Sequence, residues 1–225
     1  MNPADDSFEE FFTQAFSTET LEGGCCRLVG ISLSDLRETE CCDESRGMGH
    51  RENRPMSPEA VFQLVRNSED FLAEHLPWVR GVTVPEIAKR MRSWIFAEQY
   101  GQGGCWGIFP KVPATEPTCG KSDELAGFIM AEFNLKNHSA ALSYWLSKDY
   151  TGRGLMTDAV RTLSRYCFVV LKLNRLELSV SVTNEKSRAL ATRCGFLEEG
   201  ISRDFERING IFVNHCRFSR LARDE

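Results

Sequence analysis

Two glycines, Gly152 and Gly154, flank an arginine at the point where a short apolar run, residues 140–146, gives way to a helical pattern. Apolar residues then recur at three- and four-residue intervals as far as Val170, which predicts one face of a helix. The first turn of such a helix has unpaired backbone N–H groups and the positive end of the helix dipole, and it therefore favours anions. Glycines let the backbone approach a phosphate without a Cβ between them, and Arg153 adds positive charge. The spacing predicts a site for a diphosphate-bearing cofactor, although a plain strand-to-helix connection has the same pattern.

The sequence after this helix adds to the pattern. Residues 173–200 predict a strand, a second helix and a Gly-Phe segment at which that helix ends. The glycine turn at 152–157 does not have the spacing of a P-loop or of a dinucleotide-binding turn. From about residue 103 to 221, and more faintly over 27–83, the chain resembles the GNAT superfamily of acetyl-CoA-dependent N-acetyltransferases. Within it the chain is similar to the RimJ/RimL type, the N-terminal acetyltransferases of ribosomal proteins and their relatives. The residues that carry the resemblance are Tyr144-Trp145, Gly154-Leu-Met-Thr157, Leu173-Asn-Arg175, Asn184-x-x-Ser187, Gly195-Phe196, Glu199-Gly200 and Asn209-Gly210.

The resemblance implies where acetyl-CoA would bind. The backbone at Leu146 and Ser147 would line the pantetheine arm, with an N–H there polarising the thioester carbonyl, and Asn184 would hydrogen-bond the same arm. One departure is Asp149, where the superfamily loop usually opens with Gln or Arg. The residues that would hold the diphosphate are Thr151, Gly152, Arg153, Gly154, Leu155 and Met156.

The resemblance also implies catalytic roles. Ser187 would donate a proton to the leaving thiolate, although a serine on a helix surface would look the same. Glu206, nineteen residues later, matches the glutamate that would deprotonate the acceptor amine. A carboxylate buried beside an apolar channel would have a raised pKa, but Glu206 could instead end a strand and pair with a neighbouring arginine. Trp78 would border the acceptor, or else fill the core. His75, His138 and His215 are interpreted as structural.

Composition limits the alternatives. The chain has 225 residues, of which 42% are hydrophobic and 26% charged, which suits one substantial globular domain. A net charge of −5 argues against nucleic-acid binding, and no apolar stretch is long enough to span a membrane. Nine cysteines without an export signal indicate reduced thiols and a cytoplasmic protein, and their spacing does not predict a metal site.

The expected architecture is α/β (α+β), with a central mixed, mostly antiparallel sheet flanked by helices, as in the GNAT fold. Residues 1–24 are interpreted as an N-terminal extension, either a loosely docked leader or a lid or dimer contact, and residues 25–225 as the acetyltransferase domain. Inserted loops are expected at about 37–56 and 110–123. Ser57-Pro58 predicts the start of a helix that continues to the Leu76-Pro77 break.

These features predict an acetyl-CoA-dependent N-acetyltransferase that needs no metal and acts by direct attack of a primary amine, since no nucleophile motif is present. The resemblance implies a protein N-terminus, such as that of a ribosomal protein, as acceptor. Two alternatives stay open: a small-molecule acceptor (an antibiotic, polyamine, amino acid or aminoacyl nucleotide), or an acetyl-CoA-binding module without catalysis. A homodimer is a further possible assembly.

Overall fold

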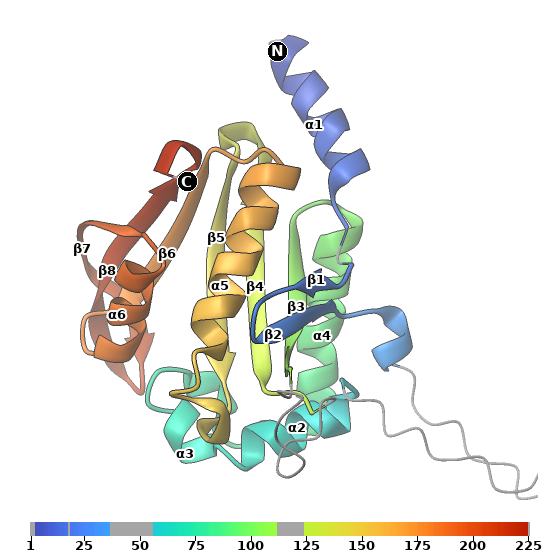
Figure 1. Cartoon of the computed structure of the whole chain (residues 1–225). Helices are drawn as coiled ribbons and strands as arrows, with labels where there is room; N and C mark the ends of the chain where they lie inside the picture. The colour runs from blue at the N-terminus through green and yellow to red at the C-terminus, as the bar shows by residue number, and fades with distance from the viewer. Residues whose placement is uncertain (1–2, 18, 37–55, 112–123, 225) are drawn as a thin grey trace, which may run out of the picture.

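A computed structural model describes residues 3–17, 19–36, 56–111 and 124–224 (Figure 1). The two inserted loops expected from the sequence lie, apart from their first or last residues, outside these ranges. None of the described helices is both long enough and apolar enough to cross a lipid bilayer. The cysteines whose state is described all carry free thiols: Cys25, Cys26, Cys105, Cys167, Cys194 and Cys216.

An eight-stranded sheet runs through the molecule in the order β1-β2-β3-β4-β5-β6-β8-β7. Every neighbouring pair is antiparallel except β5 and β6, which are parallel. The predicted mixed, mostly antiparallel sheet is therefore confirmed. The strands are β1 (Leu21–Glu22), β2 (Cys26–Gly30), β3 (Gly103–Pro110), β4 (Gly127–Asn134), β5 (Ser139–Leu146), β6 (Arg175–Ser181), β7 (Leu197–Ile208) and β8 (Ile211–Leu221).

The parallel joint between β5 and β6 is short. Only Ser139, Ala140 and Ala141 pair with β6, opposite Arg175–Glu177, and the two strands then separate. The second half of β5 keeps its partner β4 on one side and pairs with none of the described strands on the other. The sheet therefore opens between β5 and β6, toward the end from which the chain enters the glycine loop.

Helices cover both faces of the sheet (Figure 1). The amphipathic helix after the glycine loop buries Ala159 and Leu163 in a core shared with β4, β5 and β6. On the opposite face, Val65 and Ile95 pack in a second core together with strand residues. The helices are α1 (Pro3–Ala15), α2 (Pro58–Arg66), α3 (Glu69–Leu72), α4 (Val84–Gln99), α5 (Leu155–Arg165), which continues as a π-helical turn (Tyr166–Val170), and α6 (Glu185–Arg193).

Helix α2 begins where the sequence predicts. The Ser57 hydroxyl accepts the Ala60 N–H at 3.2 Å, and Pro58 occupies the first helical position. The helix does not continue to the Leu76-Pro77 break, however, but ends at Arg66. Ser68, the residue before the short α3, has φ of −125° and ψ of 15°, outside the helical region, and its buried hydroxyl bonds outside the helix (described below).

The N-terminal helix α1 is firmly docked. Phe12 is fully buried and stacks on Phe16, and both rings meet Phe133 edge-on at the far end of β4. The Tyr166 hydroxyl donates to the Ser17 carbonyl at 2.8 Å and accepts its N–H at 3.0 Å. This docking site is at the opposite end of the strands from Leu146, so α1 is not placed as a lid over the opening between β5 and β6.

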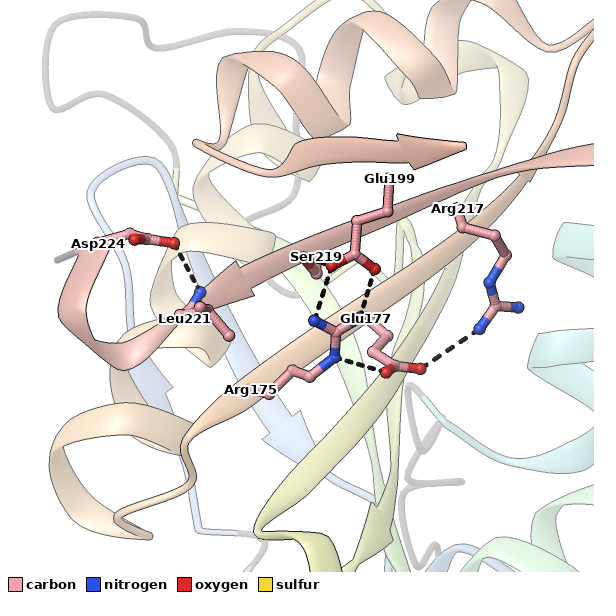
Figure 2. A network of polar contacts seen from close by, with 7 residues as sticks. All are labelled: Arg175, Glu177, Glu199, Arg217, Ser219, Leu221 and Asp224. Atoms are coloured by element: carbon pink, nitrogen blue, oxygen red, sulfur yellow. Dashed lines mark hydrogen bonds and ion pairs between the residues drawn. The ribbon is translucent and has the colours of Figure 1, made fainter. Parts of the chain in front are cut away.

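An ion-pair network joins the last three strands (Figure 2). Arg175 of β6 bonds Glu177 at 2.7 Å and Glu199 of β7 at 2.9 Å, and Ser219 of β8 donates to Glu199 at 2.7 Å. Arg217 of β8 reaches Glu177 at 3.3 Å. The hydrogen bonds from Arg175, and then from Ser219, lower the pKa of Glu199 to about 2. The network braces β6, β8 and β7 as one unit at the end of β6 that is paired with β5.

Candidate active site

The glycine loop leads into α5 with the geometry that the sequence predicts. Gly152 and Gly154 have φ of 75° and 79°, a region that favours glycine, and Gly154 is the residue just before α5. The first backbone bond into the helix is from the Asp158 N–H to the Gly154 carbonyl, at 3.0 Å. Among the described residues, nothing accepts the N–H groups of residues 152–157. A Cβ added at either glycine would meet open space. The loop is therefore an exposed, donor-rich helix start, as a diphosphate requires.

Arg153 stands at the rim of this loop. Its guanidinium lies 5.6 Å from the centre of the Tyr150 ring, and its neighbours Thr151 and Gly152 are also exposed. The Tyr150 hydroxyl donates to Glu124 at 2.9 Å. Burial, and then this bond to Glu124, raise the pKa of Tyr150 to about 12. The ring thus stays neutral and holds a cation close to the free N–H groups.

Asp158 fixes the start of α5 to the N-terminal strands. Its carboxylate accepts the N–H groups of Gly24 at 3.0 Å, Cys25 at 2.8 Å and Cys26 at 3.0 Å. Burial raises the pKa of Asp158, but these three donors outweigh burial, and the pKa lies below its usual value. A charged side chain thus orients the helix that presents the loop.

At the end of β5, the Ser147 N–H already donates to the Ala126 carbonyl at 2.8 Å. Its buried hydroxyl lies 2.9 Å from that of Ser68, which also accepts the Lys148 N–H at 3.0 Å. Ser147 therefore has no free N–H for a thioester carbonyl, and the unpaired edge of β5 belongs to the residues up to Leu146. The roles assigned to Leu146 and Ser147 stay predictions.

Across the opening, α6 presents Ser187 to β5. Asn184 caps the helix by accepting the Ser187 N–H at 3.1 Å. The Ser187 hydroxyl lies 2.8 Å from that of Tyr144, a β5 residue for which the sequence predicts no catalytic role. Burial raises the pKa of Tyr144 to about 12, although the hydrogen bond with Ser187 opposes the rise. A neutral tyrosine thus supports Ser187, which is not an isolated surface serine.

Glu206 lies within β7, on the same β6–β8–β7 side of the opening as α6. It is not buried as expected, since its side chain is 47% exposed. Its carboxylate lies 3.4 Å from the Nε2 of His215 on β8, and the expected pairing with Arg203 or Arg207 is not found among the described contacts. The Arg207 guanidinium donates to the Gly210 carbonyl instead. The histidine was interpreted as merely structural, and no local pattern in the sequence predicts its partner.

A pocket of about 250 Å³ lies on the α2–α4 face of the sheet. Tyr144, whose hydroxyl meets that of Ser187, belongs to its wall. Trp78 also belongs to the wall. The Arg90 guanidinium lies over the Trp78 ring, 4.4 Å from its centre, and the Trp145 ring meets it edge-on with ring centres 6.4 Å apart. None of the described residues that line the pocket is acidic: Ile31, Val61, Leu76, Trp78, Ile87, Arg90, Met91, Ser93, Trp94, Cys105, Phe128, Met130, Ser143, Tyr144 and Trp145.

The short helix α3 bridges the two sides of the opening. The Lys186 ammonium of α6 lies 5.9 Å from the centre of the Phe71 ring, and the Asn209 side chain of the β7–β8 turn donates to the Ala73 carbonyl at 3.1 Å. Together with Ser68 on Ser147, these contacts attach the α2–α3 segment to β5, to α6 and to the last hairpin. Ser187 on α6 and Glu206 on β7 both belong to the β6–β8–β7 side of the opening, and Ser187 reaches across it to Tyr144 of β5.

Two curated relatives share parts of this sequence. YdaF of Bacillus subtilis (strain 168), which carries the name of an N-acetyltransferase, is 43% identical over 88 residues, 39% of this chain and 48% of YdaF. The ribosomal-protein-serine acetyltransferase of Escherichia coli (strain K12) is 26% identical over 165 residues, 72% of this chain and 85% of that protein. This chain spans about half the length of YdaF and of several other curated relatives that it matches.

A family comparison and a solved structure agree with these relatives. The family model described as an acetyltransferase (GNAT) domain matches residues 54–197. The structure of RimL, a ribosomal L7/L12 alpha-N-protein acetyltransferase in complex with coenzyme A, superimposes with a TM-score of 0.73 and 20% identity. The superposition covers 92% of this chain and all of RimL. At this identity the likeness establishes a common fold.

Proposed function

This chain belongs to the GNAT acetyltransferase family, and on that premise we propose that it transfers an acetyl group from acetyl-CoA to the N-terminal amine of a protein. The observation that carries the proposal is the free row of N–H groups at residues 152–157, beside Arg153 and next to the unpaired edge of β5. A diphosphate and an extended thioester arm fit these two features in that order. A ribosomal protein is the favoured acceptor class, because a relative that aligns with 72% of this chain is named for acetylating one.

The proposed chemistry needs only residues already described. Acetyl-CoA supplies an acetyl thioester. Glu206 takes a proton from the acceptor's ammonium group, and the neutral nitrogen then attacks the thioester carbon. As the carbon–sulfur bond breaks, Ser187 donates its proton to the thiolate, and the adjacent Tyr144 hydroxyl, 2.8 Å away, replaces that proton. The nitrogen loses its second proton to water as the amide forms, and water returns a proton to Tyr144, so the site is restored. Because Glu206 is half exposed, it can return its proton to water.

The lining of the pocket that contains Trp78 indicates which class of acceptor could bind there. Its wall is mostly apolar and aromatic, with a cation, Arg90, and no acidic residue among the described lining. A polyamine would need carboxylates there to balance its charge. The lining suits an amine next to an uncharged or anionic group, which an N-terminal peptide provides.

The test is titration calorimetry of the full chain with acetyl-CoA, followed by measurement of free CoA released with a panel of peptides and small amines. We expect binding, and turnover with peptides that have a free N-terminus but not with the same peptides acetylated. Turnover on small amines alone would reassign the acceptor. Binding without turnover on the whole panel would indicate a binding module, and absence of binding would refute the proposal.

A further inference from the structure

His215 is a buried side chain whose environment calls for an explanation. It is 5% exposed on β8, and its Nδ1 lies 3.0 Å from the Ser179 hydroxyl of β6. Its Nε2 lies 3.4 Å from the Glu206 carboxylate and makes no hydrogen bond within the described part of the chain. The Phe205 ring covers the imidazole, with ring centres 4.8 Å apart. Glu206 is therefore the group toward which the free nitrogen points.

An irregularity in β7 creates this contact. Ser202 pairs with His215, but Glu206 pairs with Val213, so β7 holds two more residues than β8 over the same interval. Asp204, in the middle of the bulge, has φ of 49°, and its N–H donates to the Asn214 side chain at 2.8 Å. Residues two apart on a strand share a face, so Glu206, opposite Val213, becomes the diagonal neighbour of His215. Bulges of this kind redirect side chains near active sites.

The surroundings also choose the tautomer of His215. The Ser179 hydroxyl can donate to Nδ1 only if the ring proton is on Nε2, which then faces the carboxylate. The opposite tautomer would place a nitrogen lone pair against a negative charge. The charged groups that act on the ring are Glu206 and Arg217. Burial lowers the pKa of His215 despite the opposing attraction of Glu206, so the ring is neutral near pH 7.

We propose that His215 is a positioning residue for the acetyl transfer: held by Ser179, it directs its Nε2–H at Glu206 and fixes the carboxylate that receives the acceptor's proton. This inference rests on the proposed function. Without the histidine, the half-exposed glutamate would sample other rotamers, and a displaced base reacts more slowly. The step itself is unchanged, since the proton still moves from nitrogen to Glu206 and then to water.

The test compares four variants of the full chain: His215→Leu, His215→Gln, Glu206→Gln, and the double variant His215→Leu/Glu206→Gln. We expect His215→Leu to lower kcat roughly 10- to 100-fold, as for a misplaced catalytic group, without changing the KM for acetyl-CoA. His215→Gln should recover part of the rate, because its side-chain amide can also donate to Glu206. In the Glu206→Gln background, His215→Leu should have no further effect, since the two residues act as one unit.

Nitrogen-15 NMR of the imidazole provides a readout independent of turnover. We expect a neutral ring at pH 7 with its proton on Nε2, and a shift of that nitrogen in Glu206→Gln. A proton on Nδ1, an unchanged rate in His215→Leu, or losses that add in the double variant would each refute the role of His215 alone. A wild-type chain that binds acetyl-CoA but acetylates no amine would instead refute the proposed function, and the catalytic role of His215 with it.

Discussion

Replacing Gly154 with alanine separates the cofactor loop from the rest of the fold. Its φ of 79° lies where a residue with a Cβ is strained by about 1–2 kcal/mol. The added methyl group would touch nothing in the protein, so strain is the whole expected cost to stability. It would, however, lie beside the free N–H groups at which a diphosphate would bind, and it would keep the phosphate oxygens farther from these groups.

Gly101 offers a matched control. Its φ is 62°, a Cβ there would also meet open space, and it follows α4 at the end of the sheet remote from Leu146. Gly154→Ala and Gly101→Ala should therefore lose similar unfolding free energy, about 1–2 kcal/mol each. Only Gly154→Ala should weaken acetyl-CoA binding, by about tenfold or more, which corresponds to about 1.4 kcal/mol.

Urea unfolding gives the stability of each variant, and calorimetric titration gives its affinity for acetyl-CoA. Both are measured at one temperature and salt concentration. Equal affinities for wild type and Gly154→Ala would refute the assignment of the loop as a diphosphate site. An equal loss of affinity in Gly101→Ala would show that the loss reflects stability and not the position of the methyl group.

Three further predictions follow from the contacts. Ser187→Ala should lower kcat roughly 10- to 100-fold and Tyr144→Phe by less, because the serine faces the thiolate directly; a larger effect of Tyr144→Phe in pre-steady-state assays would reverse their roles. Asp158→Ala should lower the unfolding free energy by about 3 kcal/mol in urea, since three backbone N–H groups lose a charged acceptor; a loss under about 1 kcal/mol would contradict this. The pKa of Glu199 is lowered to about 2, so its contribution to stability is present above its unfolded value of 4.5 and lost as pH falls toward 2. Glu199→Gln should flatten that acid limb in thermal scans, and an unchanged limb would show that the network does not form.

Local sequence patterns predicted most of the architecture. The alternation along β6, the glycine that ends α6 and the Asn209-Gly210 turn, with φ of 49° and 87°, all lie where the sequence places them. The glycine loop before α5 was predicted for the same reason. Periodicity, capping and turn chemistry depend on neighbours in the chain, which a sequence displays directly.

What the sequence could not predict depends on register between distant segments. The contact of Glu206 with His215 requires a bulge whose two extra residues show only when β7 is aligned with β8. The buried contact of Ser68, at the break after α2, likewise involves Ser147, seventy-nine positions away. Tyr144 is marked in the sequence only by the family resemblance, because its partner Ser187 lies forty-three positions further on.

The three-residue joint between β5 and β6 has a consequence for how the protein unfolds. Strands β1–β5 and strands β6–β8 are continuous ladders, and within the described ranges the only ladder between them is at Ser139–Ala141. Helix α5, packed in one core with residues of both halves, and the α2–α3 segment, bonded to both, are therefore the further ties between two cooperative units. We expect hydrogen exchange to show β4 and β8 opening at different free energies. A ligand that contacts both halves would merge the two transitions.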